Sequence, residues 1–268
     1  MIHRIEGQYF HSNGTAVHYT DEGSGPPVLL LHGFAVNADL NWRLPGIIRL
    51  LKRDFRVIAM DLRGHGLSGK SHDPSKYGLE MVQDAVRLLD HLNIDRARVV
   101  GYSLGGFIAL KMACTVPGRV ERLVVMGAGW ERPGNSVFLQ ALPVLANALR
   151  EGKGIRPLAA YLGPDRKKPG LLHTWWVKMM TAYFNDGRAL AGVVQKVVDL
   201  TVREDELQKL TMPVCIIVGS EDPLRPGAEA LAERVTGAQL IIIPEADHIQ
   251  TIRRPDTRNA LRRFLLAP

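Results

Sequence analysis

The 268-residue chain has few of the features by which proteins form disulfides, bind metals or cross membranes. Its two cysteines, Cys114 and Cys215, lie far apart on an expected helix and an expected interior strand, so we expect buried free thiols and a reducing compartment. The H-x-x-x-H and C-x-x-C spacings of zinc sites are missing, which predicts no metal, and no cofactor is implied. No apolar run approaches the roughly 18 residues of a membrane span, and residues 1–14 lack the apolar stretch of a signal peptide. We therefore expect a cytoplasmic protein, although the mature form of a longer precursor would look the same.

Charge of one sign is not concentrated anywhere in the chain. Lys and Arg total 34 against 27 Asp and Glu, a net charge of +7, but the densest groups, Arg166–Lys168 and Arg253–Arg254, are short. Scattered cations favour solubility over a nucleic-acid or membrane-surface partner, so neither is expected. Aromatic residues make up 6% and hydrophobic residues 46%, which indicates an aliphatic core in one domain or in a domain with an insertion. No pattern indicates an oligomeric state.

Short apolar runs and helical periodicity alternate along most of the chain. Two N-terminal strands flank Asn13-Gly14, which is a strong hairpin signal, and six further runs are apolar throughout, as in strands buried on both faces. These strands are Gly7–Ser12, Ala16–Thr20, Val28–Leu31, Val57–Met60, Val99–Tyr102, Leu123–Met126, Val214–Val218 and Leu240–Ile243. The expected helices are Trp42–Lys52, Leu79–Leu92, Leu104–Thr115, Ala228–Val235 and Asp256–Leu266. The pattern predicts an α/β fold with a doubly wound, mostly parallel eight-stranded sheet and helices on both faces.

One interval contains helical stretches and five prolines but no convincing strand. We interpret residues 130–210 as an inserted helical cap on a core formed by residues 1–129 and 211–268, packed over the strand ends where open α/β sheets bind ligands. The alternative is an additional helical layer with no role in binding. Apolar side chains of this interval are candidates for lining a substrate pocket, or equally for packing between helices: Trp130, Trp175, Trp176, Met179, Met180, Tyr183 and Phe184.

A serine flanked by glycines follows the strand that ends at Tyr102. Residues 101–105 read Gly-Tyr-Ser-Leu-Gly, and a helix is expected to begin at Leu104. A nucleophile here needs a tight turn that projects its hydroxyl away from the sheet, and small residues two positions before and after it relieve the crowding. The helix N-terminus offers N–H groups to a developing anion. We interpret Ser103 as a nucleophile; the alternative is a glycine-rich packing turn with an incidental serine.

Two further candidate catalytic residues follow the last two apolar strands. Asp222 lies in Gly-Ser-Glu-Asp-Pro, and His248 lies in Pro-Glu-Ala-Asp-His. Because the carboxyl ends of parallel strands meet at one edge of a sheet, we expect His248 as the base and Asp222 as its orienting acid beside Ser103. Glu131, after the strand that ends at Met126, is the rival acid.

An anion formed at Ser103 needs two hydrogen-bond donors. We expect the backbone N–H groups of Leu104 and of Phe34, which lies in Leu-His-Gly-Phe after an apolar strand, to form this oxyanion hole. We interpret His32 in the same loop and His65 in Asp-Leu-Arg-Gly-His-Gly-Leu-Ser-Gly (61–69) as structural residues.

Taken together, the segments LHGF, DLRGHGLSG, GYSLGG, GSEDP and ADH resemble the α/β-hydrolase superfamily, in its serine-nucleophile, esterase- and lipase-like branch with a helical cap. The resemblance spans nearly the whole chain and implies the same roles for the five residues above. One position departs from it: relatives often have Gly before the catalytic His, where this chain has Asp247. Branches that attack with an aspartate, such as haloalkane dehalogenases, are excluded because residue 103 is Ser. C–C bond hydrolases tend to have an aromatic residue soon after the His, whereas Ile249-Gln250-Thr251 follows here.

These expectations favour a serine hydrolase that cleaves a carboxylic ester of a small to medium apolar substrate through an acyl-enzyme. C–C bond hydrolysis ranks below it. A ligand-binding sensor that retains the three residues is an alternative of a different class, because a fold does not fix a function.

Overall fold

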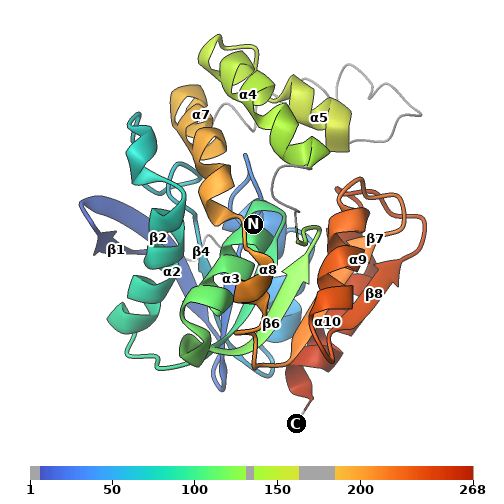
Figure 1. The fold of residues 1–268 in the computed structure, drawn as a ribbon. Coiled ribbons are helices and arrows are strands. Elements are labelled where there is room, and N and C mark those ends of the chain that lie inside the picture. The colour runs from blue at the N-terminus through green and yellow to red at the C-terminus, as the bar shows by residue number, and fades with distance from the viewer. Residues whose placement is uncertain (1–6, 131–135, 163–184, 268) are drawn as a thin grey trace.

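The computed structural model describes residues 7–130, 136–162 and 185–267, and its strands form one eight-stranded sheet (Figure 1). The strand order is β1-β2-β4-β3-β5-β6-β7-β8; β1 pairs antiparallel with β2 and β2 with β4, and all other neighbours are parallel. The strands are β1 (Gln8–Ser12), β2 (Thr15–Glu22), β3 (Pro27–Leu31), β4 (Arg56–Met60), β5 (Ala97–Tyr102), β6 (Val120–Met126), β7 (Val214–Gly219) and β8 (Gln239–Ile243). The predicted eight-stranded, mostly parallel sheet is confirmed.

Helices cover both faces of the sheet because successive strand residues bury their side chains on opposite sides. Leu29 and Leu31 belong to the core on the side of α2, α3 and α9, whereas Val28 and Leu30 belong to the core on the side of α1 and α10. All four side chains are fully buried, which explains why these runs show no polar alternation. These helices are α1 (Ile47–Leu51), α2 (Leu79–His91), α3 (Leu104–Thr115), α9 (Arg225–Arg234) and α10 (Pro255–Leu266).

The expected single helix over Trp42–Lys52 is wrong. A π-helical turn, η1 (Asp39–Arg43), comes first, and α1 begins only after Gly46, which has a left-handed φ of 81°. Pro45, between the two, has no N–H for a helical hydrogen bond, so the apolar periodicity continues across a break in the backbone. The other predicted helices occur, and the short 3₁₀ turns are η2 (Pro74–Lys76), η3 (Pro117–Arg119) and η5 (Thr251–Arg253).

The described chain between β6 and β7 is helical. Its elements are α4 (Val137–Arg150), α5 (Arg156–Leu162), α7 (Gly187–Lys196), η4 (Val197–Leu200) and α8 (Glu204–Leu207). Helix α4 packs against α7, and Figure 1 shows α4 and α5 beyond the end of the sheet rather than on either of its faces.

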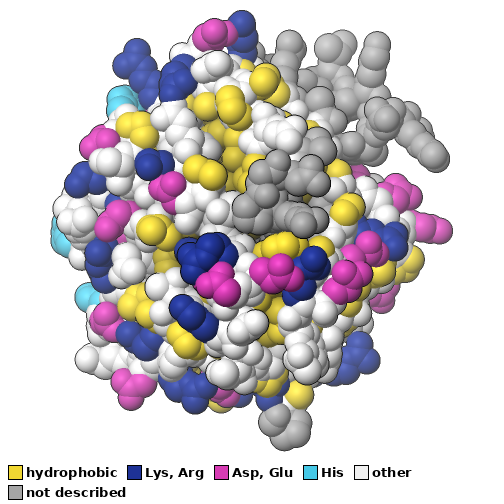
Figure 2. All heavy atoms as spheres, viewed as in Figure 1, with side chains coloured by type: hydrophobic (Ala, Val, Ile, Leu, Met, Phe, Trp, Pro, Cys, Tyr) yellow, Lys and Arg dark blue, Asp and Glu magenta, His cyan; other side chains and the backbone are white. Residues whose placement is uncertain are grey.

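The surface carries charges of both signs. On the face seen in Figure 2, Lys and Arg side chains are interspersed with Asp and Glu. Among the helices of the described ranges, none is long and apolar enough to cross a bilayer. The two cysteines lie on α3 and β7 as expected, both buried as free thiols, and burial raises the pKa of each to about 12.

Candidate active site

Ser103 lies on a sharp turn between β5 and α3. Its backbone has φ 53° and ψ −116°, a conformation that costs a residue with a Cβ about 1–3 kcal/mol. The turn brings backbones so close that a Cβ on Gly101 would lie 2.0 Å from the Gly105 carbonyl oxygen, and one on Gly105 would lie 2.0 Å from that of Leu31. Both flanking glycines are therefore required by close approach. Ser103 is the N-cap of α3, which makes Leu104 the first helical residue, with no acceptor for its N–H within the helix.

The structure brings the side chains of Ser103, His248 and Asp222 together, although 145 residues separate the first two. His248 Nε2 lies 3.0 Å from Ser103 Oγ, and His248 Nδ1 lies 2.9 Å from Asp222 Oδ2. A carboxylate only accepts hydrogen bonds, so the proton of the neutral imidazole lies on Nδ1 and leaves Nε2 to accept from the serine hydroxyl. Asp222 is 3% exposed and His248 4%, so the hydrogen bond between them is shielded from water.

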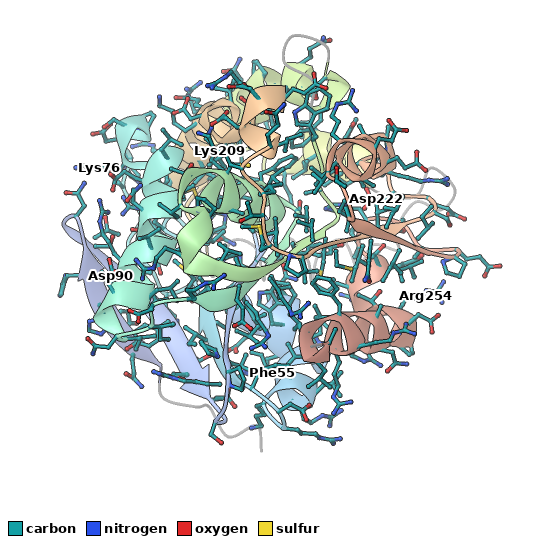
Figure 3. All side chains as sticks on the ribbon, turned by 60° about the horizontal axis from the view of Figure 1, so that its bottom comes forward. Phe55, Lys76, Asp90, Lys209, Asp222 and Arg254 are labelled. Atoms are coloured by element: carbon teal, nitrogen blue, oxygen red, sulfur yellow. The ribbon has the colours of Figure 1, made fainter. Side chains whose placement is uncertain are left out.

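The loops after β7 and β8 hold each other in place. The N–H groups of Ser220 and Glu221 donate to the carbonyl oxygens of Ile243 and Ala246, at 2.9 and 3.0 Å. Asp222 lies at the start of this pair of loops, beside α9 (Figure 3), and its Oδ1 accepts from the N–H of Leu224 at 2.9 Å. Each carboxylate oxygen of Asp222 thus has its own donor, and Oδ2 is directed to the imidazole.

Two neighbours of the imidazole were not found by the sequence analysis as parts of the site. The hydroxyl of Tyr102 donates to the carbonyl oxygen of His248 in the buried interior, and burial raises the pKa of this phenol well above its usual value. Asp247 accepts two backbone N–H groups with Oδ1, from Ile249 at 2.8 Å and Gln250 at 2.7 Å. A G-x-S-x-G pattern leaves its second residue open, so no local signal identified Tyr102.

The loop after β3 passes directly over Ser103. A Cβ built on Gly33 would lie 3.4 Å from the Ser103 Cβ, so the Gly33–Phe34 backbone borders the hydroxyl. The N–H of Gly33 donates to Asn41 Oδ1 at 2.8 Å and is therefore already paired, whereas the assignment of the next N–H, that of Phe34, to the oxyanion hole stays a prediction. His32 Nε2 accepts from the N–H of Leu62 at 2.9 Å, so its Nδ1–H donates to the Gly33 carbonyl at 2.7 Å. Burial lowers the pKa of His32, which keeps this ring neutral.

The sequence model of the alpha/beta hydrolase fold matches residues 26–255. The chain belongs to the α/β-hydrolase fold family. It is 32% identical to a non-heme haloperoxidase of Rhodococcus erythropolis over 93% of this chain and 95% of that protein. Among solved structures it is similar to a hydrolase from Pseudomonas aeruginosa PA01, with a TM-score of 0.81, 26% identity and 97% and 98% of the two chains covered. It is also similar to a carboxylesterase of Nitrososphaera gargenis, with a TM-score of 0.76, 25% identity and 97% of each chain covered.

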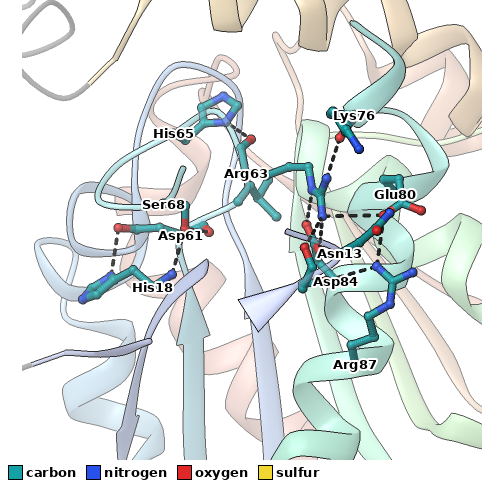
Figure 4. Close-up of polar contacts among 12 residues, drawn as sticks. Asn13, His18, Asp61, Arg63, His65, Ser68, Lys76, Glu80, Asp84 and Arg87 are labelled. Atoms are coloured by element: carbon teal, nitrogen blue, oxygen red, sulfur yellow. Dashed lines mark hydrogen bonds and ion pairs between the residues drawn. The ribbon is translucent and has the colours of Figure 1, made fainter. Parts of the chain in front are cut away.

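In this α/β-hydrolase the segment 61–69 connects several elements through buried hydrogen bonds and an ion pair (Figure 4). Asp61 accepts from His18 Nδ1 at 3.0 Å and from the N–H groups of Ala38 and Leu67, both at 2.9 Å. Burial raises the pKa of Asp61, but the hydrogen bond to His18, the nearby His32 ring and the two N–H donors outweigh it, so the net pKa is lowered. Asp61 thereby ties β2, the loop over Ser103 and its own loop together.

The next buried pair in the same segment is ionic. Arg63, 1% exposed, makes a bidentate pair with Asp84 of α2, 0% exposed, with both N–O distances 2.5 Å. Its remaining donors reach the carbonyl oxygens of Lys76 and Ser12 (Figure 4 shows the contact with Lys76). His65 donates from Nδ1 to the Arg63 carbonyl at 3.1 Å, and burial lowers its pKa to about 3.

The predicted pocket residues fall into two groups. Trp130 is 5% exposed, donates from its indole N–H to the Val202 carbonyl at 2.9 Å, and stacks under the Arg234 guanidinium at 4.1 Å. Trp130 lines a small cavity with Phe107 and Leu139. The remaining candidates and the rival acid lie outside the described residues: Trp175, Trp176, Met179, Met180, Tyr183, Phe184 and Glu131. In the described ranges, no group of three or more His, Cys, Asp or Glu side chains is arranged to hold a metal.

Proposed function

We propose that this α/β-hydrolase is a carboxylesterase that cleaves esters of small to medium apolar substrates through an acyl-enzyme. The observation that carries the proposal is the hydrogen-bonded alignment of Ser103, His248 and Asp222 at 3.0 and 2.9 Å on a strained strand-to-helix turn. The similarity to a carboxylesterase at 25% identity over 97% of each chain supports the same reaction.

In the proposed mechanism His248 Nε2 takes the hydroxyl proton as Ser103 Oγ attacks the ester carbonyl carbon. The carbonyl oxygen becomes an oxyanion that accepts from the N–H groups of Phe34 and Leu104, each contributing about 3 kcal/mol to the barrier reduction. The imidazolium then gives its proton to the departing alkoxide, which leaves as the alcohol. A water attacks the acyl-enzyme by the same route and releases the carboxylic acid and free Ser103. Asp222 orients the imidazole and stabilises its cationic form.

We further propose that residues 130–210 act as a cap over this site, on a core of residues 1–129 and 211–268. Helix α4 lies beyond the end of the sheet and packs against α7, which supports this division, and the apolar side chains that both helices bury favour an apolar acyl or alcohol group in the substrate. Candidates for the pocket lining stay Trp130, Trp175, Trp176, Met179 and Tyr183.

The test is Ser103→Ala, assayed on a series of p-nitrophenyl esters of increasing chain length. Loss of the nucleophile is expected to lower kcat by about 10⁶-fold without changing the fold. Ser75→Ala, at an exposed serine away from the site, is the matched control and should keep full activity. A serine-trapping phosphonate should add its mass at Ser103, and attachment at another residue, or an active Ser103→Ala, would disprove the assignment. A sensor would bind ligand tightly with about one turnover, whereas the enzyme turns over many times per minute.

A second candidate activity follows from the haloperoxidase that is 32% identical over 93% of this chain. A carboxylic acid acylates Ser103 with loss of water, and hydrogen peroxide in place of water then attacks the acyl-enzyme and releases a peracid and free Ser103. The peracid oxidises bromide to hypobromous acid, taking up one proton, and is reduced to the carboxylic acid. Bromination of monochlorodimedone by the protein with acetate and peroxide would support this activity. It should disappear in Ser103→Ala, because both reactions need the same acyl-enzyme.

A further inference from the structure

We propose that Asn185, which directly precedes the N-cap of α7, is a positioning residue for the oxyanion hole. Its Nδ2 donates to the carbonyl oxygen of Ala35 at 3.1 Å, across 150 residues of sequence. Ala35 directly follows Phe34, whose N–H is the proposed donor to the oxyanion. The role therefore rests on the hydrolysis proposed above, and it assigns a residue of the insertion to the chemistry of the core.

Both ends of the loop over Ser103 are fixed by side chains that lie outside the loop. Near its start the N–H of Gly33 donates to Asn41 Oδ1 at 2.8 Å. Near its end the N–H of Ala38 donates to Asp61 Oδ1 at 2.9 Å. Between these anchors, within the described chain, the contact from Asn185 is the one hydrogen bond that reaches the backbone of residues 34–36 from another element. Asn185 thus holds residues 34–36, the part of the loop between the two anchors.

The backbone at Ala35 needs such support. Its φ is 58°, in the left-handed region, where the Cβ of an L-residue crowds the following carbonyl, and its side chain is 3% exposed. Phe34 is held on its own side by an edge-on contact of its ring with His65, at 5.6 Å between centroids. The direction of the backbone on the other side of Phe34 depends on Ala35 staying left-handed. A hydrogen bond to the Ala35 carbonyl in this conformation favours it over the extended alternatives.

The experiment removes the donor in two ways. Asn185→Ala deletes the side chain, and Asn185→Asp is nearly isosteric but offers only acceptors to the Ala35 carbonyl. In both we expect kcat/KM for a p-nitrophenyl ester to fall about tenfold, carried by kcat with KM little changed, because the left-handed state loses its stabilisation. The inhibition constant of a trifluoromethyl ketone, whose adduct with Ser103 presents an oxyanion, should rise by the same factor. A merely structural role would lower the melting temperature without this parallel change.

A rescuing substitution and a control variant test whether Asn185 acts through the conformation of Ala35. Glycine adopts the left-handed conformation at no steric cost, so Ala35→Gly in the Asn185→Ala background should restore most of kcat. His72→Ala breaks the neighbouring 3.1 Å contact between His72 and Asp186 without touching residues 34–36, and should change kcat/KM by less than about twofold. Wild-type kcat in Asn185→Ala, or no rescue by Ala35→Gly, would overturn the role of Asn185 while an inactive Ser103→Ala keeps the esterase proposal. An active Ser103→Ala would overturn both.

Discussion

The replacement Asp222→Asn tests how the acid controls the imidazole. In the structure Oδ1 of Asp222 accepts from the N–H of Leu224 at 2.9 Å, and Oδ2 accepts from His248 Nδ1 at 2.9 Å. An asparagine has one acceptor and one donor end. The Leu224 N–H is fixed by the backbone and cannot become an acceptor, so it selects the amide oxygen. The amide NH₂ group must then face His248 Nδ1.

This orientation reverses the tautomer of the ring. Nδ1 becomes the acceptor from the amide, the ring proton moves to Nε2, and Nε2 loses its ability to accept from Ser103 Oγ at 3.0 Å. The same substitution in a serine protease triad lowers kcat by about 10⁴-fold, and the same magnitude is expected here because the acid likewise accepts from the Nδ1–H of the base. Binding of substrate does not use the acid, so KM should change little.

The assay is the steady-state hydrolysis of p-nitrophenyl butyrate by the wild type and three variants. Glu221→Gln is the matched control, since its side chain is the exposed neighbour of Asp222 and should give wild-type kcat. Glu131→Gln tests the rival acid and should also be nearly neutral. A fall of less than tenfold in Asp222→Asn, together with a large fall in Glu131→Gln, would show that the acid comes from the other strand and refute the reasoning.

Two further predictions concern stability. Asp84→Ala leaves the buried Arg63 guanidinium without its carboxylate, and should lower the free energy of unfolding by about 3–5 kcal/mol in urea titrations. Glu229→Gln, which breaks a half-exposed pair with Arg225, should cost less than about 1 kcal/mol. Burial lowers the pKa of both His32 and His65 in the folded state, so below the unfolded value of about 6.5 the unfolded chain binds protons that the native one does not. The free energy of unfolding should therefore decrease as the pH is lowered below about 6.5. His65→Asn should reduce the slope of this decrease by about 1.4 kcal/mol per pH unit. An unchanged slope would contradict the assignment of a neutral His65.

The arrangement of the sheet was predictable because it depends on short-range patterns. Runs such as Val28–Leu31 are apolar on both faces, and helical periodicity separates them, so a parallel sheet between two helical layers was the consistent solution. The break at Pro45-Gly46 was not predicted, because apolar residues continue at helical spacing on both sides of it. Hydrophobic periodicity reports which side chains are buried and is blind to a local change of backbone.

The positions of Ser103, Asp222 and His248 followed from topology, since each lies in the loop that follows the carboxyl end of a parallel strand. The contacts that support them did not follow. The hydroxyl of Tyr102 meets the His248 carbonyl across 146 residues, and Asn185 meets Ala35 across 150. Both depend on how loops and the insertion pack in three dimensions, and neither residue lies in a pattern that distinguishes it from its neighbours.

Asp247, the residue that departs from the family pattern, fits the site for a physical reason. Glycine before a histidine supplies backbone freedom but no side-chain hydrogen-bond acceptor. The side chain of Asp247 instead accepts the N–H groups of Ile249 and Gln250 with one carboxylate oxygen, at 2.8 and 2.7 Å. These contacts fix the turn on the C-terminal side of His248. A glycine at position 247 has no side chain that could make them. Because the carboxylate is 4% exposed and directed to backbone donors, the added charge orders the turn that presents the imidazole to Ser103.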